Sequence, residues 1–336
     1  MKHHLTDIAI IGAGPVGLFS IFQAGMLKMK CHVIDTLDMV GGQCTALYPE
    51  KPIYDIPACP SILAQELIDN LEKQASPFHP VYHLGQQVTG LEHADGGFVL
   101  TTSIGTMIAA KAVIIAAGCG AFGPNRPPLE GIELYEGKSV FYLVQRREHF
   151  RDKHVVIAGG GDSAVDWAIS LQEVAKSVTV IHRRPKFKAA PESVDRLHKL
   201  AEQGAITLEI PYQLSGLKGD KGQLKQVGIA TLDGQEKWLE ADILLPFFGL
   251  AMELGPITHW GLNLEYNHIL VNPETMQTST TNVFAVGDIA RYPGKLKLIL
   301  SGFAEAAMAC HAAYAIVNPN QALHFEYSTT KGVTVI

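Results

Sequence analysis

The order strand, glycine loop, helix, strand, acid occurs near the start of the chain and constrains the fold more than any other feature. The apolar run Asp7–Ile11 ends directly in Gly12-Ala13-Gly14-Pro15-Val16-Gly17, and the mostly apolar stretch Leu18–Met26 follows. A second apolar run, Cys31–Ile34, ends in Asp35, 23 residues after Gly12. This order predicts a β-α-β unit, which belongs to a parallel sheet.

Each residue type in this unit has a physical task. Gly12 permits a tight turn, Gly14 lets a pyrophosphate approach the backbone, and Gly17 lets the helix pack closely on the strand. The helix N-terminus attracts the anion. Asp35 can accept hydrogen bonds from both hydroxyls of an adenosine ribose, which indicates a ribose without a 2′-phosphate. The unit therefore predicts a site for FAD or NAD.

A second copy of the pattern follows, with the opposite charge. The strand His154–Ala158 leads into Gly159-Gly160-Gly161-Asp162-Ser163-Ala164 and a helical stretch through Glu173, so the loops start 147 residues apart (159 minus 12). The next strand, Val178–Ile181, ends in His182-Arg183-Arg184, with Lys186 and Lys188 close behind. Guanidinium groups bind a 2′-phosphate by charge-assisted hydrogen bonds. We expect NADPH here, in contact with Gly159, Gly161, Ser163, Arg183 and Arg184.

The two units look interleaved rather than consecutive. A strand pattern over Ala112–Gly118 is followed by a loop rich in glycine, and Ala241–Gly249 repeats this character. The late strand Thr281–Asp288 precedes a helical stretch near Ser301, which would place the Asp288 carboxylate beside a ribityl hydroxyl of the flavin. We expect an α/β protein of two Rossmann-like, three-layer domains. The NADPH domain, residues 119–249, is inserted between the two parts of the FAD domain, residues 1–118 and 250–336.

Composition excludes several classes of protein. The formal net charge of −6 argues against nucleic-acid binding. The N-terminus lacks a separate apolar leader, and no uninterrupted apolar run approaches the roughly 18 residues of a membrane span. We therefore expect a cytoplasmic protein with no membrane segment. Among 14 histidines, His79 and His83 have a helical spacing, but Pro77 and Pro80 oppose a helix there, so we expect no metal site.

Together these motifs, with Gly41-Gly42-Gln43 and Val286-Gly287-Asp288, resemble the flavoprotein disulfide reductases with two dinucleotide-binding domains, and specifically their thioredoxin-reductase-like branch. The resemblance covers nearly the whole chain. Such reductases need two cysteines a short loop apart, whereas the five cysteines here contain no such pair. The stretch that matches the thioredoxin reductase pair, Phe141–Gln145, has no cysteine, and Pro49 stands where a partner of Cys44 would be. Thioredoxin reduction is disfavoured, and we interpret Cys44 as a packed side chain.

Within this branch the chain resembles the ferredoxin:NADP reductases of thioredoxin-reductase-like type. The matching segments are Ala46-Leu47-Tyr48-Pro49-Glu50-Lys51 and the tail His324–Thr330. The resemblance implies a homodimer and a flavin ring held between Tyr48 and Tyr327. It also implies FAD contacts at Gly12, Gly14, Gly17, Asp35, Gln43, Tyr48, Val88, Phe122, Asp288 and Thr329.

The mechanistic hypothesis is hydride transfer from nicotinamide C4 to flavin N5, followed by single-electron transfers to ferredoxin or flavodoxin. It requires no acid or base from the protein. Two alternatives stay open. One is an NADPH oxidase or quinone reductase that uses the same flavin, because acceptor docking is a surface property. The other is a non-catalytic redox sensor that binds both nucleotides.

Overall fold

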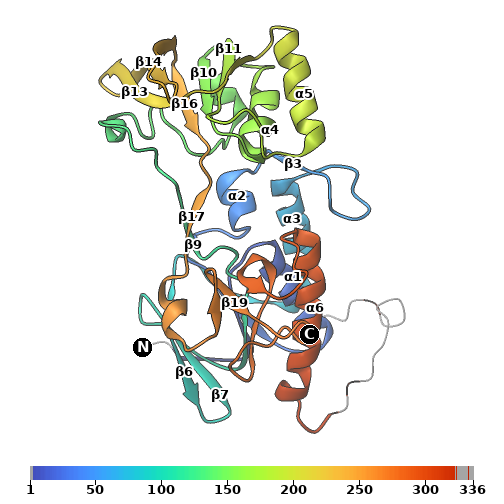
Figure 1. Cartoon of the computed structure of the whole chain (residues 1–336). Coiled ribbons are helices and arrows are strands. Elements are labelled where there is room, and N and C mark those ends of the chain that lie inside the picture. Colours follow the sequence, from blue (N-terminus) through green and yellow to red (C-terminus); the bar gives the residue numbers. More distant parts are fainter. Residues whose placement is uncertain (1–2, 322, 324–331, 333–336) are drawn as a thin grey trace. The chain divides into compact units, whose positions relative to one another are not determined.

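The computed structural model describes residues 3–321, 323 and 332, and divides the chain into two compact units (Figure 1). Unit 1 contains Met1–Phe122 and Met252–Ile336, and unit 2 contains Gly123–Ala251. The chain passes between the units in β9 (Ala121–Pro124) and β17 (Leu250–Glu253), which pair with each other. The divisions after residues 122 and 251 lie four and two residues beyond the boundaries at 118 and 249 expected from the sequence, and each falls inside one of these two strands, which begin after the glycines.

Unit 1 is built on a seven-stranded sheet whose central strands are parallel. Its strands follow the order β5-β2-β1-β8-β7-β6, and β20 pairs with β8 outside this path. The β1–β2, β1–β8, β2–β5 and β8–β20 pairs are parallel, whereas β7 pairs antiparallel with β6 and with β8. The strands are β1 (His3–Ile11), β2 (Cys31–Ile34), β5 (Val81–His83), β6 (Val88–Ala94), β7 (Gly97–Thr102), β8 (Met107–Ile115) and β20 (Val283–Ala285).

Both faces of this sheet are buried, which is why its central strands are nearly continuous apolar runs. Alternate residues of β1 enter different clusters: Ile8 and Ile10 belong to one, Ala9 and Ile11 to the other. Three helices cover the first face, namely α1 (Pro15–Met26), α3 (Ala64–Ala75) and α6 (Ile299–Val317). The second face packs on η4 (Gly255–His259) and on the small sheet of β18 (Leu264–Glu265), β19 (His268–Leu270) and β21 (Ala290–Arg291).

Helix α6 is, by length and composition, the one helix in the described part of the chain that could cross a membrane. Core helices of soluble proteins meet the same criterion. One face of α6 is fully buried, at Ala306, Ala309, Cys310 and Ala313, and the helix packs against α1. Its sequence is interrupted by Glu305, so it did not form the continuous apolar run that a sequence search would find.

Unit 2 has a four-stranded parallel sheet between two other layers. The strand order is β12-β11-β10-β16, with β10 (His154–Ala158), β11 (Ser177–Ile181), β12 (Thr207–Glu209) and β16 (Ile243–Pro246). Helix α4 (Asp162–Leu171) packs on β10, on β11 and on α5 (Pro191–Glu202). An antiparallel sheet of β13 (Gln213–Asp220), β14 (Gln223–Ala230) and β15 (Glu236–Glu240) shares a buried cluster with Val156 and Leu244 of the parallel sheet.

The remaining elements are short connections. They are α2 (Gln43–Leu47), β3 (Pro52–Ile53), β4 (Ile62–Leu63), η1 (Ser76–Phe78), η2 (Ile132–Leu134), η3 (Arg147–Phe150) and η5 (Gly287–Ile289). This architecture confirms the predicted α/β class with two Rossmann-like units.

The element boundaries differ from expectation mainly where a polar segment joins a sheet. Strands β2 and β10 begin and end at the expected residues, and α4 ends two residues before Glu173. Strand β1 begins at His3 rather than Asp7, because its largely polar first residues pair with β8 from Met107 onward. These first residues contain no apolar run, and only their pairing with β8 makes them a strand. The hydrophobic pattern of the sequence therefore could not locate the start of β1.

Candidate functional site

The glycine loop of unit 1 has the conformations that its residue types predict. Gly12 has a φ of +111°, and a Cβ there would lie 2.3 Å from the carbonyl oxygen of Ala116. A Cβ on Gly17 would lie 2.0 Å from the carbonyl oxygen of Gly12. The turn and the close packing therefore require glycine at both positions. A Cβ on Gly14 would meet only Gly42 Cα, at 3.9 Å, so the space in front of Gly14 is open.

Asp35 follows β2 and lies against this loop. Its Oδ2 accepts a hydrogen bond from the backbone amide of Ala13 at 2.6 Å, and its Oδ1 accepts one from the amide of Leu37 at 2.9 Å. Burial raises the pKa of the Asp35 carboxyl, and both amide hydrogen bonds oppose that rise. The carboxylate is therefore fixed beside the N-terminus of α1, which has no side-chain cap.

The segment from Gly41 to Tyr48 closes over the same loop. The amide of Gly41 donates to the carbonyl of Ala13 at 2.8 Å, and a Cβ on Gly42 would lie 3.1 Å from Gly14 Cα. The Gly-Gly-Gln motif is thus held directly against the glycine loop. Tyr48 directly follows α2 as its C-cap and is half-buried. Burial, with further contributions from Cys44, Asp288 and other neighbours, raises the pKa of its hydroxyl, so the ring is a neutral phenol.

Two cysteines of unit 1 lie near this segment without pairing. Cys44 is buried, its Sγ lies 3.8 Å from the Tyr48 hydroxyl, and burial is the main cause that raises the pKa of its thiol to about 11. Gln43 Nε2 donates to Cys119 Sγ at 3.1 Å, and burial also raises the pKa of Cys119. Both thiols are protonated at neutral pH, which is the inert form.

Asp288 reaches the same region from the other end of unit 1. It lies in η5, shortly after β20, and its charge contributes to the raised pKa of Cys44, Tyr48 and Cys119. The preceding Gly287 has a φ of +75°, and its amide donates to Glu305 Oε2 at 2.7 Å. Asp35, Gln43, Tyr48 and Asp288, which lie up to 253 residues apart in the sequence (288 minus 35), are thus parts of one unit.

Sequence reasoning missed the residue that supports this turn. Glu305 of α6 is 2% exposed, accepts a 2.7 Å hydrogen bond from the Tyr292 hydroxyl at Oε1, and pairs with Lys295. The only available signal in the sequence was a single glutamate within an alanine-rich helix. A fully buried acid requires partners, so this glutamate indicated that partners existed but not which residues they were. Neither partner is adjacent to it in the sequence.

Unit 2 contains a cavity of about 740 Å³ at its own glycine loop. Four of the residues that line it were expected, namely Gly159, Gly161, Arg183 and Arg184, and Lys188, close behind the arginines in the sequence, also lines it. A Cβ on Gly160 would lie 2.1 Å from the His182 ring, whereas a Cβ on Gly161, the N-cap of α4, would meet no atom within 4 Å. The other walls were not foreseen and come from distant loops, namely Pro127–Leu129, Tyr212–Leu214 and Phe247–Gly249.

The remaining expected contact residues lie in different surroundings or outside the described residues. Ser163 is exposed in the first turn of α4 and does not line the cavity. Val88 is buried among apolar side chains of the second face of the unit 1 sheet, so its side chain serves packing. Tyr327, Thr329 and the side chain of Phe122 lie outside the described residues. His79 follows η1 and His83 ends β5, so these two do not form the helical pair considered from the sequence.

The chain contains two β-α-β units with glycine loops. A carboxylate follows one of them and two arginines follow the other. This combination defines a class of oxidoreductase with two dinucleotide-binding folds. Residues 6–314 match the pyridine nucleotide-disulphide oxidoreductase family, and the chain belongs to that family.

Relatives within the family are similar over their full length. The chain is 61% identical over 334 residues to a protein of Paramagnetospirillum magneticum named ferredoxin–NADP reductase, covering 99% of each. It is 60% identical to a protein of Acidiphilium cryptum with the same name, covering 98% of this chain and 97% of the relative. Among solved structures, thioredoxin reductase of T. acidophilum superposes with a TM-score of 0.80 at 26% identity, covering 93% of this chain and 98% of the other.

Proposed function

We propose that this chain is an FAD-dependent enzyme that transfers electrons between NADPH and ferredoxin or flavodoxin. The observation that carries the proposal is the opposite charge of its two glycine-loop sites. Asp35 follows the second strand in unit 1, and Arg183 with Arg184 follows the second strand in unit 2. A carboxylate selects ribose hydroxyls and an arginine selects a 2′-phosphate, so the two sites discriminate between FAD and NADPH.

The residues of unit 1 fit FAD. Open space in front of Gly14 and the uncapped N-terminus of α1 suit a pyrophosphate. The Asp35 carboxylate suits the adenosine ribose, and Asp288 suits the ribityl chain. Tyr48, as a neutral and half-buried phenol, suits one face of the flavin ring. When bound, FAD supplies the chemistry of accepting a hydride and releasing electrons one at a time.

The residues of unit 2 fit NADPH. Gly161 leaves open space at the N-terminus of α4, where the pyrophosphate of the nucleotide would lie. Arg183 and Arg184 are exposed on the cavity wall and free to orient toward a 2′-phosphate. The volume of about 740 Å³ falls in the range of cavities that hold ligands of this size.

The state of the cysteines supports single-electron acceptors over disulfide substrates. Disulfide exchange requires a thiolate with a second cysteine in reach. Residues 120–309 contain no cysteine, and burial keeps the Cys44 and Cys119 thiols of unit 1 protonated. The names of the two closely similar relatives point to the same acceptor, ferredoxin.

Rapid mixing of the purified flavoprotein with NADPH or NADH tests the proposal. We expect fast loss of oxidised-flavin absorbance with NADPH, slow loss with NADH, and cytochrome c reduction only when ferredoxin or flavodoxin is added. Fast bleaching with turnover on oxygen or quinone alone would favour the oxidase alternative. Very slow bleaching by either nucleotide would favour the sensor, and failure to take up FAD would refute the assignment of unit 1.

The assembly and location of the protein remain predictions. A homodimer is expected from the family resemblance, and sedimentation of the flavoprotein tests it. Cytoplasmic location is expected from the sequence, and fractionation of cells that produce the protein tests it.

A further inference from the structure

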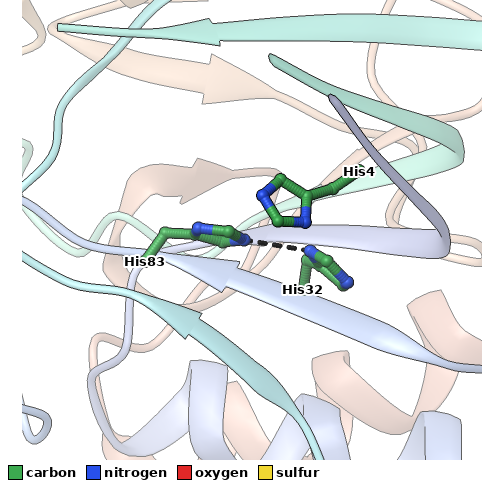
Figure 2. Close-up of side chains that lie close together, drawn as sticks. All are labelled: His4, His32 and His83. Carbon is green, nitrogen blue, oxygen red and sulfur yellow. Dashed lines mark hydrogen bonds between the residues drawn. The ribbon is translucent and has the colours of Figure 1, made fainter. Parts of the chain in front are cut away.

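Three histidines from three neighbouring strands meet in unit 1 (Figure 2). His4 lies near the start of β1, His32 lies in β2, and His83 ends β5. Each ring offers one nitrogen such that all three lie within 4.8 Å of one another. The closest pair, His32 Nδ1 and His83 Nε2, lies 2.9 Å apart. The rings of His4 and His83 have centroids 4.9 Å apart, and those of His4 and His32 lie 5.3 Å apart.

Two of the three imidazoles, those of His32 and His83, are held in the neutral form that coordinates metals. His32 and His83 are 9% and 8% exposed, and His4 is half-buried. Burial, followed by repulsion from His83 and His4, lowers the pKa of His32 to about 4. Burial and His4 also lower the pKa of His83. Burial and neighbouring histidines both lower the pKa of this pair, so at His32 and His83 no proton has to leave at neutral pH before a metal binds.

We propose that His4, His32 and His83 form a binding site for one divalent transition-metal ion, of which Zn²⁺ is the reference case. Zinc–nitrogen bonds of about 2.0–2.1 Å in tetrahedral geometry place ligand nitrogens about 3.3 Å apart. The observed nitrogens lie at 2.9 Å and within 4.8 Å, so small rotations of the rings bring all three into range. Three imidazoles leave a fourth position for water, and imidazole also suits Cu²⁺ and Ni²⁺.

The ion would connect strands that the sheet joins in a row. The order β5-β2-β1 makes them neighbours, but His4 lies in the part of β1 that pairs with β8 rather than with β2. A bound metal ion would therefore hold the start of β1 against β2 and β5. The carbonyl of His83 accepts a 3.1 Å hydrogen bond from the amide of Asp35, so the same ion would also support the strand end that carries this carboxylate.

Zinc titration of the chelator-treated flavoprotein, produced without a histidine tag, tests the proposal. We expect one Zn²⁺ per chain by calorimetry, visible absorption bands of a tetrahedral site when Co²⁺ is used as the probe, and a higher unfolding temperature with zinc. His4→Gln should lower zinc affinity about tenfold or more, since even supporting residues of metal sites have effects of this size.

His3→Gln is the matched control, because His3 is an exposed histidine on the adjacent position of the same strand. His4→Gln is preferred to changes at His32 and His83 because its side chain is less buried, and circular dichroism checks that it folds. Equal zinc affinity in the His4 and His3 variants would overturn the proposal. So would the absence of stoichiometric binding by the unmodified protein, which would leave the trio as a packed cluster of neutral rings.

Discussion

Replacing Arg183 and Arg184 together with alanine should remove the preference of unit 2 for NADPH. Both side chains line the cavity, and both are exposed. A hydrogen bond to a charged group contributes about 1.5–3 kcal/mol, and exposure to water places these two at the lower end. One lost contact of about 1.5 kcal/mol corresponds to roughly a 12-fold weaker interaction, and two to roughly 150-fold, since each 1.4 kcal/mol is tenfold.

The assay compares kcat/KM for NADPH and for NADH with the same electron acceptor. The double variant should lose roughly 150-fold with NADPH if the two contacts add. It should change little with NADH, because NADH has no 2′-phosphate. Lys186→Ala is the matched control, since Lys186 is an exposed cation in the same loop that does not line the cavity. An unchanged NADPH to NADH ratio, or an equal loss with both nucleotides, would refute the reasoning.

Three further changes test separate parts of the structure. Gly161→Ala adds a Cβ that meets no atom within 4 Å, so the unfolding midpoint should stay the same. The KM for NADPH should rise about tenfold, because the Cβ occupies the space of the pyrophosphate, and an unchanged KM would place the pyrophosphate elsewhere. Glu305→Gln leaves Lys295, whose side chain is 7% exposed, without its charge partner and should cost about 3 kcal/mol in urea unfolding; full stability would contradict the buried pair. Cys44→Ala should leave the turnover rate unchanged, and loss of turnover in a folded variant would indicate that Cys44 has a redox role. In the unmodified protein, alkylation of Cys44 should become faster only as the pH rises toward the pKa of its thiol, about 11.

Much of the fold could be predicted because it depends on short segments. Gly12 is required locally by its positive φ and Gly17 by the nearby carbonyl of Gly12, and their spacing is visible in a window of six residues. Strands buried on both faces are mostly apolar, so β2 and β10 were located to the residue although each contains one histidine. The charge change from Asp35 to Arg183 is equally local, since each residue lies within two positions of a strand end.

The parts that could not be predicted involve partners far apart in the chain. Strand β1 extends to His3 because β8, about 100 residues later, pairs with it. The outer walls of the unit 2 cavity come from loops around residues 127, 212 and 247, none of which carries a motif. Gln43 meets Cys119, although neither position indicates the other.

The fold class, the two glycine loops and the charge after each second strand could be predicted from short segments of the chain. The support that Glu305 gives to the turn before Asp288, and the meeting of His4, His32 and His83, became visible only in the folded chain. The physical reason is that backbone conformation and apolar periodicity are properties of short segments. Proximity of side chains depends on sheet order and helix packing, which are fixed only when the whole chain folds.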